Sequence, residues 1–409
     1  MQMHMQQRSL SFHDGHAGRL GAGTPAPVKR NALAMLVLLA TTSPAFAADW
    51  WTTLPPPPTH GPTVIEVRDM GAKGDGVTDD TAAFQRAIDA LPTSEGGAVH
   101  VSPGRYMIDA TAVTCPGANA GTHECGIILR RSHMKLSMDV GAVLAVIPND
   151  QGHYNLLYVK GQNNIEIRGG RIVGDRVKHV DTGGATGQNE QGMGIRIGAS
   201  TNILVDWTEA SNFWGDGLVI GGSSDYVRLD QVKSTGNRRQ GLTIGAAQHV
   251  LVTNSTFADT NGTAPQDGVD IEPDPGFGDA QNIRFSNNTM TGNFGNGLEV
   301  HSSNTADYPP NVSNLTLVNN TMDQNHGYGV LLQNLEFAPQ VSSNDFTNNG
   351  GAGLYLSGIT HDAVITDNTM TGNSTQYWCS DTYSGPRRDM CIGPKTYNIQ
   401  LSGNVYTGN

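Results

Sequence analysis

Apolar and polar residues alternate in short runs through the second half of the chain, and each run begins with a glycine. The segment GLVI at residues 217–220 is one example. A two-residue alternation places successive side chains on opposite faces of a β-strand. The pattern predicts short strands that begin at Gly194, Gly217, Gly241, Gly268, Gly297, Gly329 and Gly353.

A series of asparagines runs in step with these strands. Successive members lie 25, 24, 32, 32, 24 and 24 residues apart, at Asn212, Asn237, Asn261, Asn293, Asn325, Asn349 and Asn373. Such a period is about one coil of a three-sheet solenoid, whose coils pair in parallel about 4.8 Å apart. We assign these residues a structural role, because Asn tolerates left-handed bends and stacked Asn side chains can bond from coil to coil. The chain is expected to be an all-β, parallel β-helix.

One segment near the N-terminus has helical spacing instead. Thr78 is a suitable N-cap, since its hydroxyl can accept a backbone N–H of the first turn. The sequence predicts a capping helix from about Asp79 to Leu91, preceded by a short strand at residues 64–67. The apolar stripe of the helix consists of Phe84, Ile88 and Leu91.

The first 47 residues have the pattern of a secretion signal. Lys29 and Arg30 precede an apolar run at residues 32–40, and an Ala-x-Ala cleavage motif follows at residues 45–47. The apolar run is too short to span a bilayer as an ordinary helix. We expect a signal peptide at 1–47, a Trp- and Pro-rich linker at 48–62 and the β-helix at 63–409. The mature chain is then periplasmic or secreted and has no transmembrane segment.

The net charge limits the class of binding partner, and the cysteines predict disulfide bonds. The net charge is −12, and the mature chain is more negative still because residues 1–47 carry four basic residues and one acid. This charge argues against nucleic acid as a partner. The four cysteines form two locally spaced pairs, which predict the disulfides Cys115–Cys125 and Cys379–Cys391, with free buried thiols as the alternative.

Two motifs carry a family resemblance. They are DMGAKGDGVTDDT at residues 69–81 and GGAVHVSPGRY at residues 96–106. This stretch resembles the N-terminal part of the pectate-lyase-like superfamily, which includes polygalacturonases, rhamnogalacturonases, polysaccharide lyases, alginate C5-epimerases and phage tailspikes. The resemblance implies a right-handed parallel β-helix and a polysaccharide partner. It does not fix the reaction, because one fold hosts many activities.

The strand alternation also predicts which side chains face outward. The first outward position of each strand forms one column, which reads Arg196, Val219, Thr243, Asp270, Glu299, Leu331 and Tyr355. Asp270 is thus expected beside Glu299 on the next coil, and Glu272 beside His301. Asp267 lies at the entrance of the same strand. Acidic residues are therefore concentrated on two adjacent coils.

Paired carboxylates are the groups that glycoside cleavage needs. Their mutual repulsion raises one pKa and leaves the partner ionised, so that one acts as acid and the other as base or nucleophile. We predict catalysis by Asp270 and Glu299, supported by Asp267 and Glu272. Close stacking would suit a retaining pair, and the diagonal pair of Asp267 and Glu299 the wider inverting geometry. A solvated acidic patch or a Ca²⁺ site is the alternative, and no other metal or cofactor is predicted.

Other residues around this column are candidates for substrate binding. Both 32-residue gaps contain about eight extra residues that form loops beside the acidic strands. Aromatic residues in these loops can stack on sugars, and arginines before the strands can hold a carboxylate or sulfate, or else balance the nearby acids. The candidates are His301, Arg238, Arg239, Asp216, Arg196, Phe277 and Tyr308.

Family motifs leave the reaction open. The sequence DGVD at residues 267–270 resembles the Asp-Gly-x-Asp turn of polygalacturonases, and residues 268–273 keep the Gly and Asp of the alginate C5-epimerase strand but not its His. A polysaccharide lyase or C5-epimerase is the second hypothesis, with His301, Arg238 and Arg239 as candidates. A non-catalytic glycan-binding protein is the third. The asparagine series reaches Asn409 with no visible cap, and we expect capping by a partner chain, as in a homotrimer.

Overall fold

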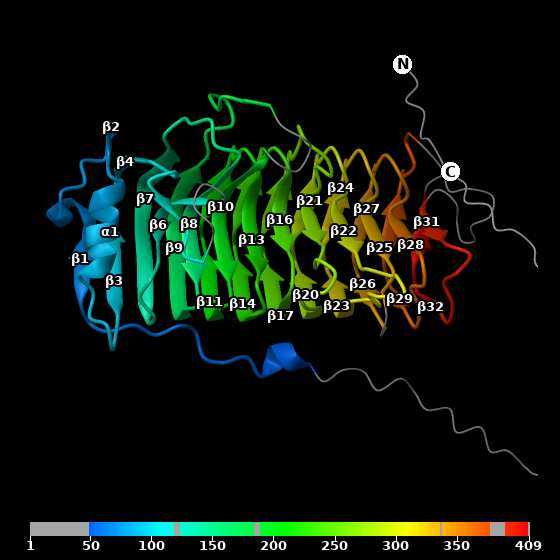
Figure 1. Cartoon of the computed structure of the whole chain (residues 1–409). Coiled ribbons are helices and arrows are strands. Elements are labelled where there is room, and N and C mark those ends of the chain that lie inside the picture. The colour runs from blue at the N-terminus through cyan, green and yellow to red at the C-terminus, as the bar shows by residue number, and fades with distance from the viewer. Residues whose placement is uncertain (1–48, 118–122, 184–188, 336–337, 377–388, 408–409) are drawn as a thin grey trace, which may run out of the picture. The chain divides into compact units, whose positions relative to one another are not determined.

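The computed structural model describes residues 49–117, 123–183, 189–335, 338–376 and 389–407. These residues form a solenoid of stacked coils (Figure 1). The expected parallel β-helix is confirmed. Residues 1–47, Cys379 and Asn409, on which three expectations rest, lie outside the described residues.

One face of the solenoid is a sheet of eleven strands, called here the eleven-strand sheet. Its strands pair in parallel except for β5 and β6, which are antiparallel. They are β5 (Val113–Thr114), β6 (Glu124–Ile128), β8 (His153–Lys160), β10 (Gln191–Gly198), β13 (Asp216–Gly221), β16 (Gln240–Ile244), β19 (Val269–Ile271), β22 (Leu298–His301), β25 (Val330–Gln333), β28 (Leu354–Ser357) and β31 (Met390–Ile392).

The remaining strands form two further faces, joined through the long strands β7 (Met134–Val146) and β9 (Asn163–Val173). One face contains β1 (Val64–Glu66), β3 (Gly97–Val101), β11 (Thr201–Asp206), β14 (Ser224–Asp230), β17 (Ala247–Thr253), β20 (Ala280–Ser286), β23 (Val312–Val318), β26 (Gln340–Ser342), β29 (Val364–Thr366) and β32 (Gln400–Ser402). The other contains β2 (Asp75–Asp79), β4 (Gly104–Ile108), β12 (Glu209–Ser211), β15 (Lys233–Thr235), β18 (Thr256–Ala258), β21 (Thr289–Thr291), β24 (Thr321–Asp323), β27 (Asp345–Thr347), β30 (Thr369–Thr371) and β33 (Val405–Tyr406).

The capping helix is present but shorter than expected. Helix α1 spans Thr81–Asp89, with Asp80 as its N-cap, and short 3-10 turns lie at Trp50–Thr52 (η1) and Val67–Met70 (η2). The expected N-cap, Thr78, lies in β2 instead. The Asp80 carboxylate accepts the backbone N–H groups of Lys73 and Gly74, which holds the preceding turn and delays the start of the helix.

Inward-facing aliphatic side chains form a continuous core. Along the eleven-strand sheet, successive register partners at one inward position are each at most 1% exposed. They are Ile195, Leu218, Leu242, Val269 and Leu298. Burial of one such side chain stabilises the fold by about 2 kcal/mol. Each coil therefore contributes its own share of the core.

The glycines that open the strands are required by packing. A Cβ on Gly217 would lie 2.0 Å from Ser234 Oγ, and one on Gly241 would lie 2.4 Å from the carbonyl oxygen of Gly268. A larger residue cannot be placed at these positions without moving the backbone of the next coil. The regular glycine spacing in the sequence thus has a steric cause.

The expected stack of asparagines is confirmed for the later coils. The Nδ2 of Asn293 donates to Asn325 Oδ1 over 2.9 Å, and Asn325 donates in the same way to Asn349 over 3.0 Å. The left-handed residue of each bend precedes the stacked one, as at Gln324, with a φ of 54°. The asparagines of this stack therefore serve as hydrogen-bonding side chains.

Two members of the predicted series do not belong to this stack. The backbone N–H groups of Phe213 and Thr260 occupy the stacking positions and donate to Asn237 and Asn293, over 3.0 and 3.1 Å. Asn212 instead takes the left-handed position, with a φ of 57°, and Asn261 follows Thr260. Sequence spacing alone could not separate the left-handed residue of a bend from the stacked one that follows it.

A second buried ladder, not identified from the sequence, makes a stability prediction. Asn344 Oδ1 accepts both the backbone N–H and the Nδ2 of Asn320, and Asn344 itself donates to Asn368. Asn344→Ala leaves these donors unpaired, so the free energy of unfolding should fall by about 3 kcal/mol. Urea denaturation measures this change. The exposed Asn163 is the control, and Asn163→Ala should change stability by about 0.5 kcal/mol or less; equal effects of both variants would contradict the ladder's role.

The residues before β1 form a strap, defined here as residues 50–56, along the outside of the solenoid (Figure 1). Its Trp50 ring lies 5.3 Å from the His249 ring of β17, and Trp51 lies beneath the Arg284 guanidinium of β20. At its other end, the carbonyl oxygen of Pro56 accepts hydrogen bonds from Arg228 and Asn202. The segment expected as a linker is thus attached to four successive coils.

One predicted disulfide is confirmed. Cys115 and Cys125 are bonded beside the antiparallel pair of β5 and β6, at a Cα separation of 5.1 Å. The bond ties the loop after β5 to the first coils of the eleven-strand sheet.

Candidate active site on the eleven-strand sheet

The expected outward column is present. Asp270 of β19 and Glu299 of β22 are register partners. Thr243, Val219 and Arg196 precede them, one on each earlier strand. Paired Cα atoms of neighbouring parallel strands lie about 4.8 Å apart. The strand alternation therefore places two carboxyl groups side by side on adjacent coils.

Asp270 is a buried carboxyl group with an incomplete set of partners. Only 2% of the residue is exposed, and its Oδ2 accepts a 2.5 Å hydrogen bond from Gln240 Nε2. Within the described part of the chain, Oδ1 has no hydrogen-bond partner. Burial, and then the charges of Glu272 and Glu299, raise the pKa of Asp270 to about 8. The group is therefore protonated at neutral pH.

Asp267 lies at the entrance of β19 and is fully buried. Burial, followed by the charges of Glu299 and Asp270, raises the pKa of Asp267 well above its usual value. Its Oδ1 accepts the backbone N–H of Asn296, and its Oδ2 has no hydrogen-bond partner among the described residues. The Glu299 charge raises the pKa of Asp267, so this diagonal pair is close enough to interact, and its inverting geometry stays a prediction.

Glu299 is the ionised member of the group. Its side chain is 17% exposed, Asn296 Nδ2 donates to it over 2.8 Å, and His301 Nδ1 lies 3.9 Å away. Burial favours a higher pKa for Glu299, but the influence of His301, Asp267 and Asn296 outweighs burial and lowers the pKa. Contact with Glu299 in turn raises the pKa of His301. A carboxylate thus lies beside an imidazole whose protonated form it stabilises.

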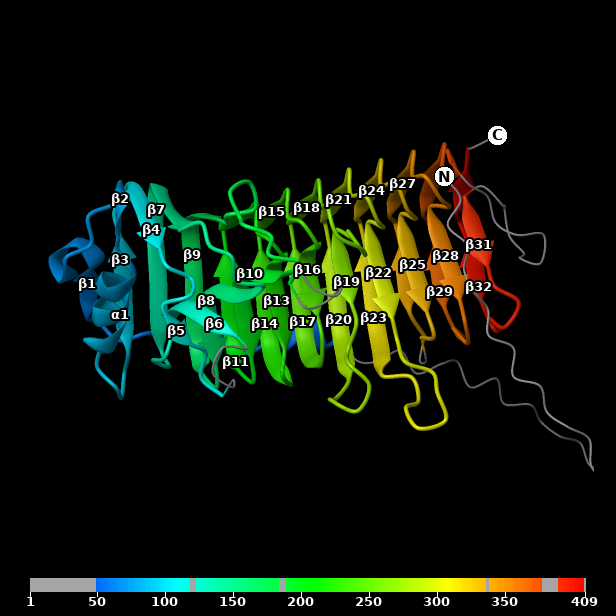
Figure 2. The same cartoon turned by 45° about the horizontal axis from the view of Figure 1, so that its top comes forward.

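Glu272 continues the sheet beyond β19, where its backbone N–H donates to the Ile244 carbonyl over 2.9 Å. Glu272 and His301 line one cavity of about 430 Å³ beside the loops that follow β19 and β22. Both loops project from the same side of the solenoid (Figure 2). Their predicted aromatic residues are accessible, since Phe277 is 79% and Tyr308 44% exposed.

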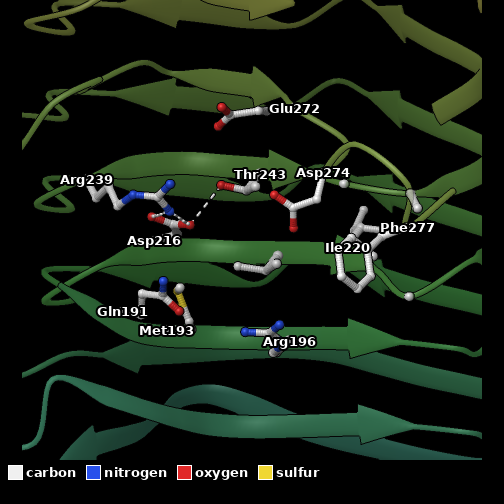
Figure 3. A pocket seen from close by; sticks show the side chains of 15 residues that line it. Gln191, Met193, Arg196, Asp216, Ile220, Arg239, Thr243, Glu272, Asp274 and Phe277 are labelled. Atoms are coloured by element: carbon white, nitrogen blue, oxygen red, sulfur yellow. Dashed lines mark hydrogen bonds and ion pairs between the residues drawn. The ribbon is translucent and has the colours of Figure 1, made fainter. Parts of the chain in front are cut away.

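A second cavity of about 360 Å³ extends from the acidic residues toward the N-terminal coils. Glu272 lies at one end of it and Arg196 at the other, with Asp274 and Phe277 along one side between them (Figure 3). Among the described residues, Arg196 forms no ion pair or hydrogen bond. The two cavities share Glu272 and Asp274, so together they follow the eleven-strand sheet over several coils.

Arg239 and Asp216 form a buried ion pair below this cleft. Arg239 Nη1 lies 3.0 Å from Asp216 Oδ2, which also accepts a 2.8 Å hydrogen bond from Thr243. Burial raises the pKa of Asp216, and the charge of Arg239 opposes this shift. Of the two roles expected for Arg239, the structure shows the balancing of an acid. Its Nη1 is engaged with Asp216, while the residue also lines the cavity.

Arg238 is held elsewhere. Its guanidinium lies 3.9 Å from the centre of the Trp214 ring, and its Nη1 lies 3.9 Å from Glu190 Oε2. Arg238 thus lies beside Glu190, because its side chain turns toward Trp214 of the preceding coil.

Two residues of the site were not predicted. Gln240 and Asn296 bind Asp270 and Glu299 through their amide groups. Both stand directly before a strand-opening glycine, as Asp216 and Asp267 do. On these coils the position before the glycine holds an acid or an amide in turn. This recurrence was the sequence signal that could have identified Gln240 and Asn296.

The described residues form neither a cluster of metal ligands nor a membrane-spanning helix. No group of three or more His, Cys, Asp or Glu residues in the described ranges is arranged to hold a metal ion. No helix of the described chain is long and apolar enough to cross a membrane.

Comparison with known proteins adds relatives of two kinds. The chain is 29% identical to the uncharacterised protein YclG of Bacillus subtilis over 344 residues, which cover 76% of this chain and 56% of YclG. It is 27% identical to the pre-neck appendage protein of Bacillus phage phi29, over 61% of this chain and 28% of that protein. The chain thus spans about half the length, or less, of these curated relatives.

A solved structure shares the fold, and a family profile covers most of the solenoid. The A-module of mannuronan C-5 epimerase AlgE6 from Azotobacter vinelandii matches with a TM-score of 0.65 at 22% identity, over 84% of this chain and 87% of that one. The profile described as rhamnogalacturonase A/epimerase, pectate lyase-like, matches residues 64–355. The chain therefore belongs to the rhamnogalacturonase A/epimerase, pectate lyase-like family.

Proposed function

We propose that this protein is a glycoside hydrolase that cleaves a polysaccharide with Asp270 as the general acid and Glu299 as the base or nucleophile. One observation carries the proposal. The two carboxyl groups are register neighbours, and their pKa values move in opposite directions. A protonated and an ionised carboxyl group at one place are what glycosidic bond cleavage requires.

The reaction follows from the two protonation states. Asp270 donates its proton to the glycosidic oxygen as the bond to the leaving sugar breaks. Glu299, the more exposed of the two, attacks the anomeric carbon or removes a proton from the attacking water. The Asn296 amide holds the Glu299 carboxylate by a hydrogen bond. The Cα spacing of about 4.8 Å between adjacent coils supports the closer, retaining arrangement.

A lyase or C5-epimerase acting on a uronate polymer is the second candidate. Arg196 favours it, because an unpaired guanidinium in the cleft can neutralise a uronate carboxylate. Two contacts speak against it. The raised pKa of His301 reduces the share of its neutral, basic form, and Arg239 is paired with Asp216.

A glycan-binding protein without catalysis is the third candidate. It is favoured by the similarity to a phage appendage protein. Export to the periplasm or beyond, assembly as a homotrimer and a role for Ca²⁺ stay predictions of the sequence analysis.

The product of the reaction separates these proposals. Incubation of the protein with neutral and acidic polysaccharides should release new reducing ends, without the ultraviolet absorbance of an unsaturated uronate. A rise in both signals would identify a lyase and contradict the hydrolase. Retention of the protein on a polysaccharide without either signal would favour the binding protein, unless proton exchange at C5 of a uronate in heavy water reveals an epimerase.

A further inference from the structure

Three glycines form a bare strip on the eleven-strand sheet. Gly198 occupies the second outward position of β10, and Gly221 occupies the same position of β13. Gly245 follows the last residue of β16. All three are partly exposed, and Gly221 and Gly245 line the 360 Å³ cleft. The strip continues into Glu272 at one end and into Lys160, the register partner of Gly198, at the other.

Packing within the protein does not account for these glycines. A Cβ placed on Gly198 or Gly221 would meet nothing within 4 Å, and one on Gly245 would make only ordinary contacts, at 3.8 Å or more. None of the three has the left-handed backbone that favours glycine. They differ in this from the strand-opening glycines, where a Cβ would collide with the next coil. The strip therefore leaves open space that the fold itself does not need.

The N-terminal end of the strip is positively charged. A cavity of about 170 Å³ adjoins the cleft there, and Arg196 lines both. Lys160, His123 and Tyr158 also line this cavity, next to the Cys115–Cys125 disulfide. The pKa of His123 is lowered by burial and then by the positive charges of Arg196 and His153. Two cationic side chains, Arg196 and Lys160, thus line this cavity, and an anion would relieve their repulsion.

The opposite end is negative. Glu272 and Asp274 line the cleft beside Phe277, and the Glu299 carboxylate lies on the next coil. Arg196 is three register steps from Asp270, through Val219 and Thr243, which is about 14 Å at 4.8 Å per step. A sugar in an extended glycan covers about the length of one such step. The change from negative to positive charge along the cleft would therefore distinguish acidic from neutral sugars at a position several sugar residues away from the carboxyl pair.

We propose that the glycan lies lengthwise on the eleven-strand sheet with its rings over the glycine strip, and that an acidic sugar binds at Arg196 and Lys160. The anionic group is a carboxylate or a sulfate, which a guanidinium and an ammonium both recognise. The scissile bond lies about three sugars away, at Asp270 and Glu299; this part rests on the proposed function. The substrate class is a polysaccharide with an acidic sugar at that distance from a neutral one.

Binding without turnover tests the inference separately from hydrolysis. Calorimetry would measure the affinity of the Glu299→Gln variant for three sets of oligosaccharides of graded length. The first set carries uronates, the second is the same set after reduction of the carboxyl groups, and the third consists of sulfated neutral oligosaccharides. We expect the uronate or sulfated form to bind at least about tenfold more tightly than the neutral form. The tighter of these two forms identifies the anion.

Three variants locate the site. Arg196→Gln should remove most of the preference for the acidic form, and Gly221→Leu should weaken acidic and neutral forms alike by filling the strip. Gly198→Leu repeats the steric test on another coil if Gly221→Leu does not fold. Ser357→Leu is the matched control, because Ser357 continues the same outward positions through Gln333, two coils beyond His301. Ser357→Leu should change neither affinity.

Each outcome decides one claim. Equal affinity for acidic and neutral forms, or a preference that survives Arg196→Gln, would overturn the anion site. Full affinity in both folded glycine variants would overturn the strip. Binding with the expected preferences, but no cleavage by the unmodified protein, would contradict the hydrolase and leave the glycan path intact.

Discussion

Glu299→Gln is expected to lower kcat for polysaccharide cleavage by about a thousandfold, the usual scale for the loss of a catalytic base or nucleophile. The substitution keeps the size of the side chain but removes the only carboxylate in the buried group whose pKa is lowered. KM should change little, because sugars along the cleft are held mainly by other residues. Steady-state kinetics on the preferred polysaccharide measure both constants.

The same substitution should not destabilise the fold. Glu299 lies beside Asp267 and Asp270, and its charge contributes to the raised pKa of each. An amide at this place removes the repulsion, so Tm should stay constant or rise. The matched control is Glu209→Gln on β12, where the side chain is 45% exposed and paired with Arg171. Glu209→Gln should keep full activity; unchanged cleavage by Glu299→Gln would exclude Glu299 from the mechanism.

Asp270→Asn is expected to abolish cleavage and to change the dependence of stability on pH. The folded-state pKa of about 8 exceeds the ordinary value of 3.8, so between these values the folded protein keeps a proton that the unfolded chain releases. Stability therefore falls as pH rises through this window, by at most about 1.4 kcal/mol for each pH unit. Asn carries no titratable proton and removes this loss.

The comparison of two pH values isolates the effect. Urea denaturation of both proteins at pH 5 and pH 8 should show that Asp270→Asn gains stability over the unmodified protein at pH 8, by up to about 4 kcal/mol relative to pH 5. Activity of the unmodified protein should also decline above about pH 8, where the acid loses its proton. A parallel pH dependence of both proteins would show that Asp270 is ionised in the fold.

The outward column of the site could be predicted because a strand has a strict two-residue period. Once Gly268 and Gly297 were taken as strand starts, Asp270 and Glu299 had to become register neighbours. The glycine spacing was equally informative, since it has a steric cause in the contact with the next coil.

Features that depend on bends and long side chains could not be predicted in this way. The stacking position differs by one residue from the left-handed position, and Asn is favoured at both, so spacing alone could not tell the role of Asn212 from that of Asn237. Arg239 and Arg238 could reach several partners from their positions, and only the structure shows Asp216 and Trp214 as the ones they contact. The burial of Asp270 was also not visible in an alternating pattern, which marks its position as outward.

The strap changes how the solenoid should come apart. In a repeat protein each coil contacts only its neighbours, so unfolding can begin at a free end and spread one coil at a time. Residues 50–56 contact β11, β14, β17 and β20 at once, through Asn202, Arg228, His249 and Arg284. Loss of any one of these four coils therefore also loosens the segment that holds the other three. The central coils should melt as one cooperative block, and the coils after β23 should fray first.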